Sequence, residues 1–318
     1  MLAQTQEVSV RFGSVTAVNA VNMEVGPGEV VGLLGANGAG KTTLIRLLLG
    51  LIRPSSGRVR LFGARPSLET RRSVGYVPQT LGLYSDMTVL QNWRFVGSAF
   101  GRAPTRPPEE IRRWENDLVG SLSLGVARRV AFVVALAHEP RLLVLDEPTS
   151  GVGPLGAARL WQEIRTAAEQ GVGVLVTTHN MEEAEQCDRL SVMVAGKVEA
   201  EGTVQDVIAG RTVVEVRCDD WQRAFSALDD NGYAVQAHGE VLRVPAPPTA
   251  VGAVTGLLER EGMTASAEVR PASLDEAFIS ILSDSREHDT GSAADETAHN
   301  GTGPSATTNT TPAGDRGP

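Results

Sequence analysis

The chain is poor in cysteine, in metal-ligand patterns and in long apolar runs. Its 318 residues include two cysteines, Cys187 and Cys218, which are too few for a disulfide framework or a zinc site and are expected to fill core space. The five histidines show no spacing typical of metal ligands. The longest apolar run, residues 130–137, is far shorter than the ~18 residues of a membrane-spanning helix. The N-terminus lacks the basic and apolar segments of a signal peptide, so we expect a cytosolic chain that does not itself cross a membrane.

Basic residues are also in deficit. The formal net charge is −9, which disfavours a nucleic-acid partner. The apolar content of 42% is enough for a substantial core, and the length accommodates one large domain and a smaller one.

Residues 1–210 alternate short apolar runs with helical stretches, the pattern typical of a parallel α/β sheet. Between residues 87 and 140 the apolar residues recur only at helical spacing, which predicts an all-helical insertion. The expected strands are residues 8–11, 21–25, 30–34, 59–62, 74–77, 142–145, 172–177 and 190–194.

Residues 211–283 have a different pattern of apolar residues. It predicts the order strand, helix, strand, strand, helix, strand and a terminal helix over 274–282. This order predicts a small ferredoxin-like α+β domain. After Leu282 the chain has no Val, Ile, Leu, Met, Cys or aromatic residue. Because such a segment cannot bury enough apolar surface to order itself, we expect residues 284–318 to be a disordered tail.

A complete phosphate-binding loop of the form GxxxxGK[ST] follows the apolar run of residues 30–34 and precedes a helical stretch. Backbone N–H groups and the helix N-terminus would hold phosphate oxygens there, and the Thr42 hydroxyl would bind Mg²⁺. Lys41 is one of two lysines among 29 lysine and arginine residues, which suggests a position where a compact ammonium is required. The loop therefore predicts binding of a nucleoside triphosphate. The expected nucleotide contacts here are Gly35, Ala36, Asn37, Gly38, Ala39, Gly40, Lys41, Thr42 and Thr43.

Two carboxylates, Asp146 and Glu147, end the apolar run of residues 142–145. The carboxyl end of a parallel strand lies beside the phosphate loop in a sheet of this type. Asp146 is suited to hold Mg²⁺, and Glu147 is suited to act as a general base toward water.

These stretches, with three further ones, resemble the nucleotide-binding subunit of an ABC transporter over residues 8–203. Gly-Tyr-Val-Pro-Gln at 75–79 resembles the Q-loop of that family, and Thr-Thr-His at 177–179 resembles its histidine switch. Phe-Gly at 12–13 resembles its aromatic A-loop. The resemblance implies the fold of an ABC-type P-loop NTPase that binds ATP with Mg²⁺.

The resemblance also implies residue roles. Phe12 would stack on adenine, and His179 would contact the γ-phosphate and help Glu147 to orient the attacking water. Gln79 would join Thr42 and Asp146 at the Mg²⁺ and link that site to the membrane partner.

The family works as dimers in which a signature segment of one subunit contacts the ATP of the other. The matching stretch is residues 121–129, where Ser123 and Gly125 fit the family pattern. Leu124 departs from it, because the family has Gly at that position, and Gly153 replaces the Asp of the family's D-loop. The sequence therefore predicts nucleotide binding and leaves open whether a homodimer hydrolyses the nucleotide.

Residues 271–279 resemble the end of the accessory domain found in exporters of the ABC-2 type. The resemblance implies an ATP-hydrolysing subunit of an exporter, docked on a separate integral-membrane permease at the inner face of the cell membrane, with cargo contacts on the permease. Two alternatives stay open. One is a degenerate ATP-binding regulatory half of a heterodimer, which Leu124 and Gly153 favour. The other is a soluble ABC-type ATPase of DNA repair or translation, disfavoured by the acidic balance and by the absence of zinc-binding cysteine pairs.

Overall fold

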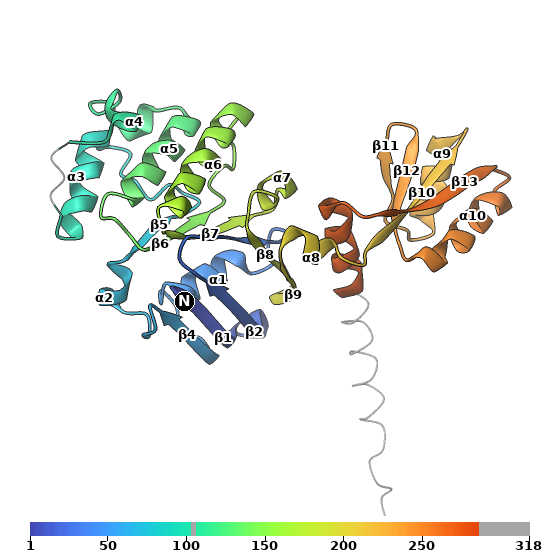
Figure 1. Cartoon of the computed structure of the whole chain (residues 1–318), viewed down its shortest axis with the longest axis horizontal. Helices are drawn as coiled ribbons and strands as arrows, with labels where there is room; N and C mark the ends of the chain where they lie inside the picture. Colours follow the sequence, from blue (N-terminus) through green and yellow to red (C-terminus); the bar gives the residue numbers. More distant parts are fainter. Residues whose placement is uncertain (103–105, 286–318) are drawn as a thin grey trace, which may run out of the picture.

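A six-stranded sheet forms the centre of the larger part of the molecule. The computed structural model describes residues 1–102 and 106–285, and the tail expected over 284–318 lies outside them from residue 286 onward. Figure 1 shows this sheet within a larger body and a smaller lobe beside it. The strand order is β5-β6-β7-β3-β8-β9, parallel except for β9 at one edge. These strands are β3 (Val30–Leu34), β5 (Val74–Val77), β6 (Leu142–Asp146), β7 (Gly173–Thr178), β8 (Arg189–Val194) and β9 (Lys197–Gly202).

Both faces of this sheet are buried, and alternate residues serve different cores. In β6, Leu143 and Leu145 belong to one apolar cluster, whereas Leu142 and Val144 belong to another. Side chains alternate between the faces of a strand, so a strand that is covered on both sides needs an unbroken apolar run. The strands β3, β6 and β7 are buried at every position, which is why their sequences are almost continuously apolar.

A second, three-stranded sheet packs on one side of the large sheet. It comprises β1 (Ala3–Phe12), β2 (Val15–Val25) and β4 (Ser56–Leu61) in the order β2-β1-β4, all antiparallel. The expectation that these strands belong to a single parallel sheet was wrong. Only two residues join β1 to β2, and a parallel connection needs a crossover of a dozen residues or more.

Helices cover the other face, and the described part of residues 87–140 contains helices and no strand, as predicted. The edge strand β9 was not predicted from the sequence, because its side chains alternate between exposed and half-buried and include charged residues. The helices of the larger part of the molecule are α1 (Lys41–Leu48), α2 (Leu68–Arg71), α3 (Val89–Ala99), α4 (Glu109–Arg112), η1 (Val119–Ser121), α5 (Leu124–Ala135), α6 (Pro154–Glu169), α7 (Met181–Ala184) and α8 (Val204–Ile208).

The smaller lobe has the predicted ferredoxin-like arrangement. Its antiparallel strands lie in the order β11-β12-β10-β13, with two helices packed on one face around a separate apolar core. The elements are β10 (Thr212–Cys218), α9 (Trp221–Asp230), β11 (Gln236–His238), β12 (Val241–Pro245), η2 (Pro248–Ala250), α10 (Val251–Arg260) and β13 (Ala265–Pro271).

The last helical segment, residues 274–285, leaves the small lobe and packs against the larger body (Figure 1). Its Leu274, Phe278 and Ile281 join the core cluster that contains Val207 of α8. At its start, the fully buried Glu276 pairs with Arg243 of β12, Nε to Oε1 at 3.1 Å. The segment therefore connects the two parts through apolar packing at one end and a buried ion pair at the other. No helix among the described residues is long and apolar enough to cross a bilayer.

The contact between this helix and the larger body can be tested with Ile281→Ala. Ile281 is 2% exposed, so the truncation should lower the free energy of unfolding by about 2–5 kcal/mol. Urea denaturation followed by circular dichroism measures the change. Ser283→Ala, at an exposed position of the same helix, is the control and should change stability little. Equal stability of the two variants would contradict the packing.

Candidate functional site

The candidate site lies where β3, β6 and β7 end. These strands are parallel and adjacent in the sheet, so their carboxyl ends meet at one edge. Ligands of open α/β sheets bind at this edge. Residues 35–40 form the loop from β3 to α1, Asp146 ends β6 and Glu147 follows it, and His179 follows β7.

The loop is shaped to leave backbone donors free. Gly40 has φ 105°, a value that side-chain-bearing residues rarely adopt, and a Cβ there would lie 2.4 Å from the carbonyl oxygen of Ala17. Gly40 caps α1 without a side-chain hydrogen bond, and the first turn of α1 carries no acidic residue. The exposed tip of the loop is formed by Ala36, Asn37 and Gly38. The unpaired N–H groups of a helix N-terminus and the helix dipole suit a loop of this shape to holding an anion.

Lys41 is buried and turned into the loop. Its Nζ donates to the carbonyl oxygens of Gly35 at 2.7 Å and Ala36 at 3.2 Å, and lies 3.7 Å from Oε1 of Glu147. Burial lowers the pKa of the Lys41 ammonium, and the nearby charges of Glu147 and Asp146 partly offset this. An anion bound in the loop would act in the same direction as these carboxylates and favour the charged ammonium.

Thr42 and Asp146 provide oxygen ligands side by side. The hydroxyl of Thr42 donates to Oδ2 of Asp146 at 3.1 Å, while Oδ1 of Asp146 accepts from Thr177 at 2.6 Å. Mg²⁺ prefers hard oxygen ligands and commonly takes one or two from the protein, with water and phosphate completing its shell. Thr42 and Asp146 fit that requirement. The described residues contain no group of three or more His, Cys, Asp and Glu that could hold a metal ion by themselves.

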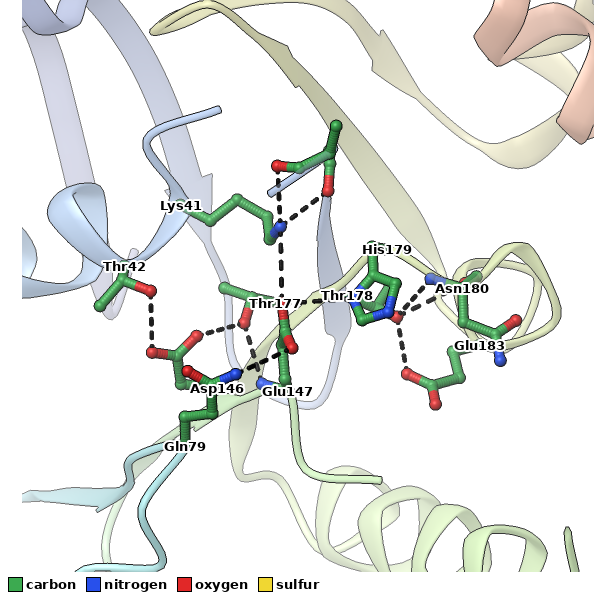
Figure 2. A network of polar contacts seen from close by, with 12 residues as sticks. Lys41, Thr42, Gln79, Asp146, Glu147, Thr177, Thr178, His179, Asn180 and Glu183 are labelled. Carbon is green, nitrogen blue, oxygen red and sulfur yellow. Dashed lines mark hydrogen bonds and ion pairs between the residues drawn. The ribbon is translucent and has the colours of Figure 1, made fainter. Parts of the chain in front are cut away.

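Glu147 is the centre of the network in Figure 2. Its Oε2 accepts from Nε2 of Gln79 at 3.3 Å, and its Oε1 lies 3.3 Å from Nδ1 of His179 and 3.7 Å from the Lys41 ammonium. The backbone of Glu147 has φ 49°, an unfavourable value for a residue with a side chain. Strained backbone of this kind is found where the surrounding structure holds a functional side chain in place.

Of the predicted residues, Lys41, Thr42, Gln79, Asp146, Glu147 and His179 are thus brought together. Phe12 is placed differently, as the last residue of β1 with its side chain 54% exposed. It pairs with Val15 at the end of the β1–β2 hairpin. This hairpin reaches the loop through Ala17, so Phe12 lies near the loop without contributing to the network.

The predicted signature segment lies apart from the loop of its own chain. Ser123 precedes α5 and makes no side-chain capping bond, and Gly125 lies in the first turn. At the start of α5, Leu124 lies beside Gly151, and Gly125 faces Val152, so this end of the segment packs on the turn that follows Glu147. Leu124 is the first residue of α5 and is 44% exposed.

Sequence reasoning missed Thr177 and Arg128. Thr177 is fully buried and pairs with Asp146 across β6 and β7; its hydroxyl also accepts from the N–H of Glu147 at 3.0 Å. A threonine near the end of a buried strand was the only sequence feature that could have indicated this role of Thr177. Arg128 is 5% exposed, burial lowers its pKa, and charge interactions with Glu147 and Asp146 partly restore it. Arg128 lies within the predicted signature stretch of residues 121–129, but that pattern gave it no role.

Comparison with known proteins gives consistent matches. The sequence profile described as "ABC transporter" matches residues 18–150. The "Probable multidrug ABC transporter ATP-binding protein YbhF" of Escherichia coli K12 is 39% identical over 237 residues, which cover 71% of this chain and 41% of that protein. The chain therefore spans less than half the length of this relative. The "Nod factor export ATP-binding protein I" of Cupriavidus metallidurans is 35% identical over 300 residues, covering 88% of this chain and 97% of that protein.

Solved structures of ABC transporter cassettes resemble this chain as well. The structure of an "ATP binding subunit of ABC transporter" is 30% identical, with a TM-score of 0.61, covering 65% of this chain and 92% of that one. The dimeric cassette MJ0796 is 25% identical, with a TM-score of 0.57, covering 63% of this chain and 98% of that one.

The position of Asp146 should depend on Thr177. Thr177→Val removes the hydroxyl donor while keeping the shape, which leaves a buried carboxylate oxygen with one partner fewer. We expect a loss of about 1–3 kcal/mol in unfolding free energy, together with weaker binding of magnesium nucleotide, measured by urea denaturation and calorimetry. Thr177→Ser keeps the hydroxyl and is the control. If Val and Ser behaved alike, the hydroxyl would have no such role.

Proposed function

The chain belongs to the ABC transporter family, and on this basis we propose that it is the ATP-binding and ATP-hydrolysing subunit of an exporter. It would power transport through a separate integral-membrane permease and be held at the inner face of the membrane by that permease. The observation that carries this proposal is the network joining Lys41, Thr42, Asp146 and Glu147 at the mouth of the phosphate loop.

Binding of ATP follows from the free donors of the loop. The N–H groups at the start of α1 would hold phosphate oxygens, and the Lys41 ammonium would leave the carbonyl oxygens of Gly35 and Ala36 to contact the β- and γ-phosphates. Phe12, near the loop on the β1–β2 hairpin, would stack on the base. Thr42 and Asp146, with Gln79, would hold Mg²⁺, which neutralises charge developing on the phosphates when bound.

Hydrolysis follows from the position of Glu147. Its carboxylate is held by Gln79 on one side and faces His179 on the other, so it can accept a proton from an attacking water. The imidazole of His179 is about half exposed and can reach toward the γ-phosphate. Lys41 lies between the loop and Glu147, where it can stabilise charge on the transferred phosphoryl group.

The partners are inferred from the family. A dimer of nucleotide-binding subunits would place the start of α5 of one copy, with Ser123 and Gly125, against the phosphate loop of the other. One relative is named for a multidrug ABC transporter and another for Nod factor export, and the second name supports export as the direction of transport.

A second candidate function is an ATP-binding subunit that completes only one of the two sites in a heterodimer. Leu124 supports it, because this bulky, partly exposed side chain stands at the first residue of α5 and lies beside Gly151. A phosphate that must approach the first turn of α5 would meet this side chain. In a heterodimer, the loop of this chain could still meet an intact signature of the partner.

The catalytic role of Glu147 is tested by Glu147→Gln. The amide keeps the hydrogen-bonding shape but is a far weaker base, so turnover should fall about 10²–10⁴-fold while calorimetric affinity for magnesium ATP is retained. ATP hydrolysis by the purified chain, alone and with its permease, is the measurement. Glu185→Gln, at an exposed position, is the matched control. Undiminished turnover by Glu147→Gln would refute the assignment.

The two candidate functions are separated by Leu124→Gly. If Leu124 blocks an otherwise competent signature, the glycine should raise ATP turnover of the purified chain about tenfold or more, since aligned backbone donors are worth ~10²–10³ in rate. Leu155→Gly is the control, because Leu155 is an exposed leucine in the first turn of α6. An increase confined to Leu124→Gly supports the heterodimer function, and unchanged turnover counts against it.

A further inference from the structure

The strand β13 ends the sheet of the small lobe with an open edge. It follows β10 in the strand order, and nothing pairs with its other side in the described part of the chain. Five of its seven residues are exposed. Unpaired strand edges attract other strands, so a protein must either block such an edge or use it.

The register shows which backbone groups face outward. The N–H of Ala272 donates to the carbonyl oxygen of Arg211, and these two residues lie opposite each other in the β10–β13 register. Hydrogen-bonded pairs alternate with non-bonded pairs in an antiparallel ladder. Glu268 and Arg270 therefore direct their backbone groups to β10, whereas Ala267 and Val269 direct theirs to the open side.

The side chains of this edge form a self-complementary pattern. Glu268 and Arg270 lie on the face opposite the helices, 68% and 52% exposed, and pair with each other at 2.7 Å. Between them, Val269 points to the helix-covered face, because its neighbour Val214 lies in the core there. Val269 is nevertheless 40% exposed, since no further strand covers it.

From these observations we propose that β13 pairs with β13 of a second copy of this chain, antiparallel and centred on Val269. In this register Val269 lies opposite its own copy as a hydrogen-bonded pair, and the two valine side chains cover each other. Glu268 lies opposite Arg270 of the second copy, and Arg270 lies opposite its Glu268. These are the close, non-hydrogen-bonded positions, where opposite charges favour pairing.

Neighbouring registers of the two β13 strands lack these favourable cross-strand charge pairs. Centring the pair on Glu268 places like charges opposite each other, and centring it on Ala267 leaves Arg270 opposite no strand residue. Glu215 of β10 lies opposite Glu268, and each carboxylate has an arginine of its own strand beside it, Arg217 at 2.8 Å and Arg270 at 2.7 Å. An arginine arriving on the other side of Glu268 would give this pair of carboxylates one more positive charge. The two four-stranded sheets would join into one across a two-fold axis. This pairing does not depend on the proposed ATP hydrolysis.

Charge reversal tests the proposal on the full chain, free of nucleotide and Mg²⁺ so that dimers formed through ATP do not contribute. Sedimentation velocity should show a reversible dimer. Glu268→Arg and Arg270→Glu should each weaken it about tenfold or more, because both ion pairs become repulsive. The double variant Glu268→Arg with Arg270→Glu should restore it, and a mixture of the two single variants should form a heterodimer. Glu240→Arg, an exposed reversal elsewhere in the small lobe, should have no effect.

Cysteine cross-linking tests the register. Val269→Cys should form a covalent dimer under mild oxidation, because Cα atoms of a hydrogen-bonded pair lie ~5.5 Å apart, within disulfide range. Glu240→Cys is the control. A wild-type chain that stays monomeric at its highest soluble concentration would overturn the proposal. Single reversals that dimerise like the wild type, or no cross-link at 269, would also overturn it.

Discussion

The site depends on a balance of charges at the buried end of a sheet. Lys41, Asp146 and Glu147 are all largely buried, and none of the three charges would be tolerated alone at that depth. Each is held by the others or by backbone and hydroxyl groups. Because the ammonium interacts with carbonyl oxygens that it can exchange for phosphate, the resting network keeps the cation in place and available.

This balance needs a sheet that is covered on both faces. The apolar strands β3, β6 and β7 supply two cores from alternate residues and bring three chain segments to one edge. The rigidity of the strands is what allows Glu147 to keep an unfavourable φ beside Thr177. The apolar packing thus positions the polar side chains, and these side chains form hydrogen bonds with the groups at the ends of the strands.

The small lobe is joined to this body by the short link from α8 to β10 and by the returning helix of residues 274–285. The apolar face of this helix completes the core next to α8, while the buried pair of Arg243 and Glu276 holds its start to β12. A self-pairing edge on β13 would place two such bodies on one two-fold axis. The accessory lobe would then keep two ATP-binding bodies near each other in the absence of nucleotide.

The sequence alone determined the class of fold, the phosphate loop, the two carboxylates and the succession of strands and helices along the small lobe, because glycine spacing and apolar periodicity are local patterns. It did not determine that β1, β2 and β4 form a separate antiparallel sheet, nor that Thr177 positions Asp146. Those depend on which segments lie side by side. Likewise, Leu124 stands beside Gly151, and Val269 lies at an open edge, only because folding brings distant segments together or leaves one strand unpaired.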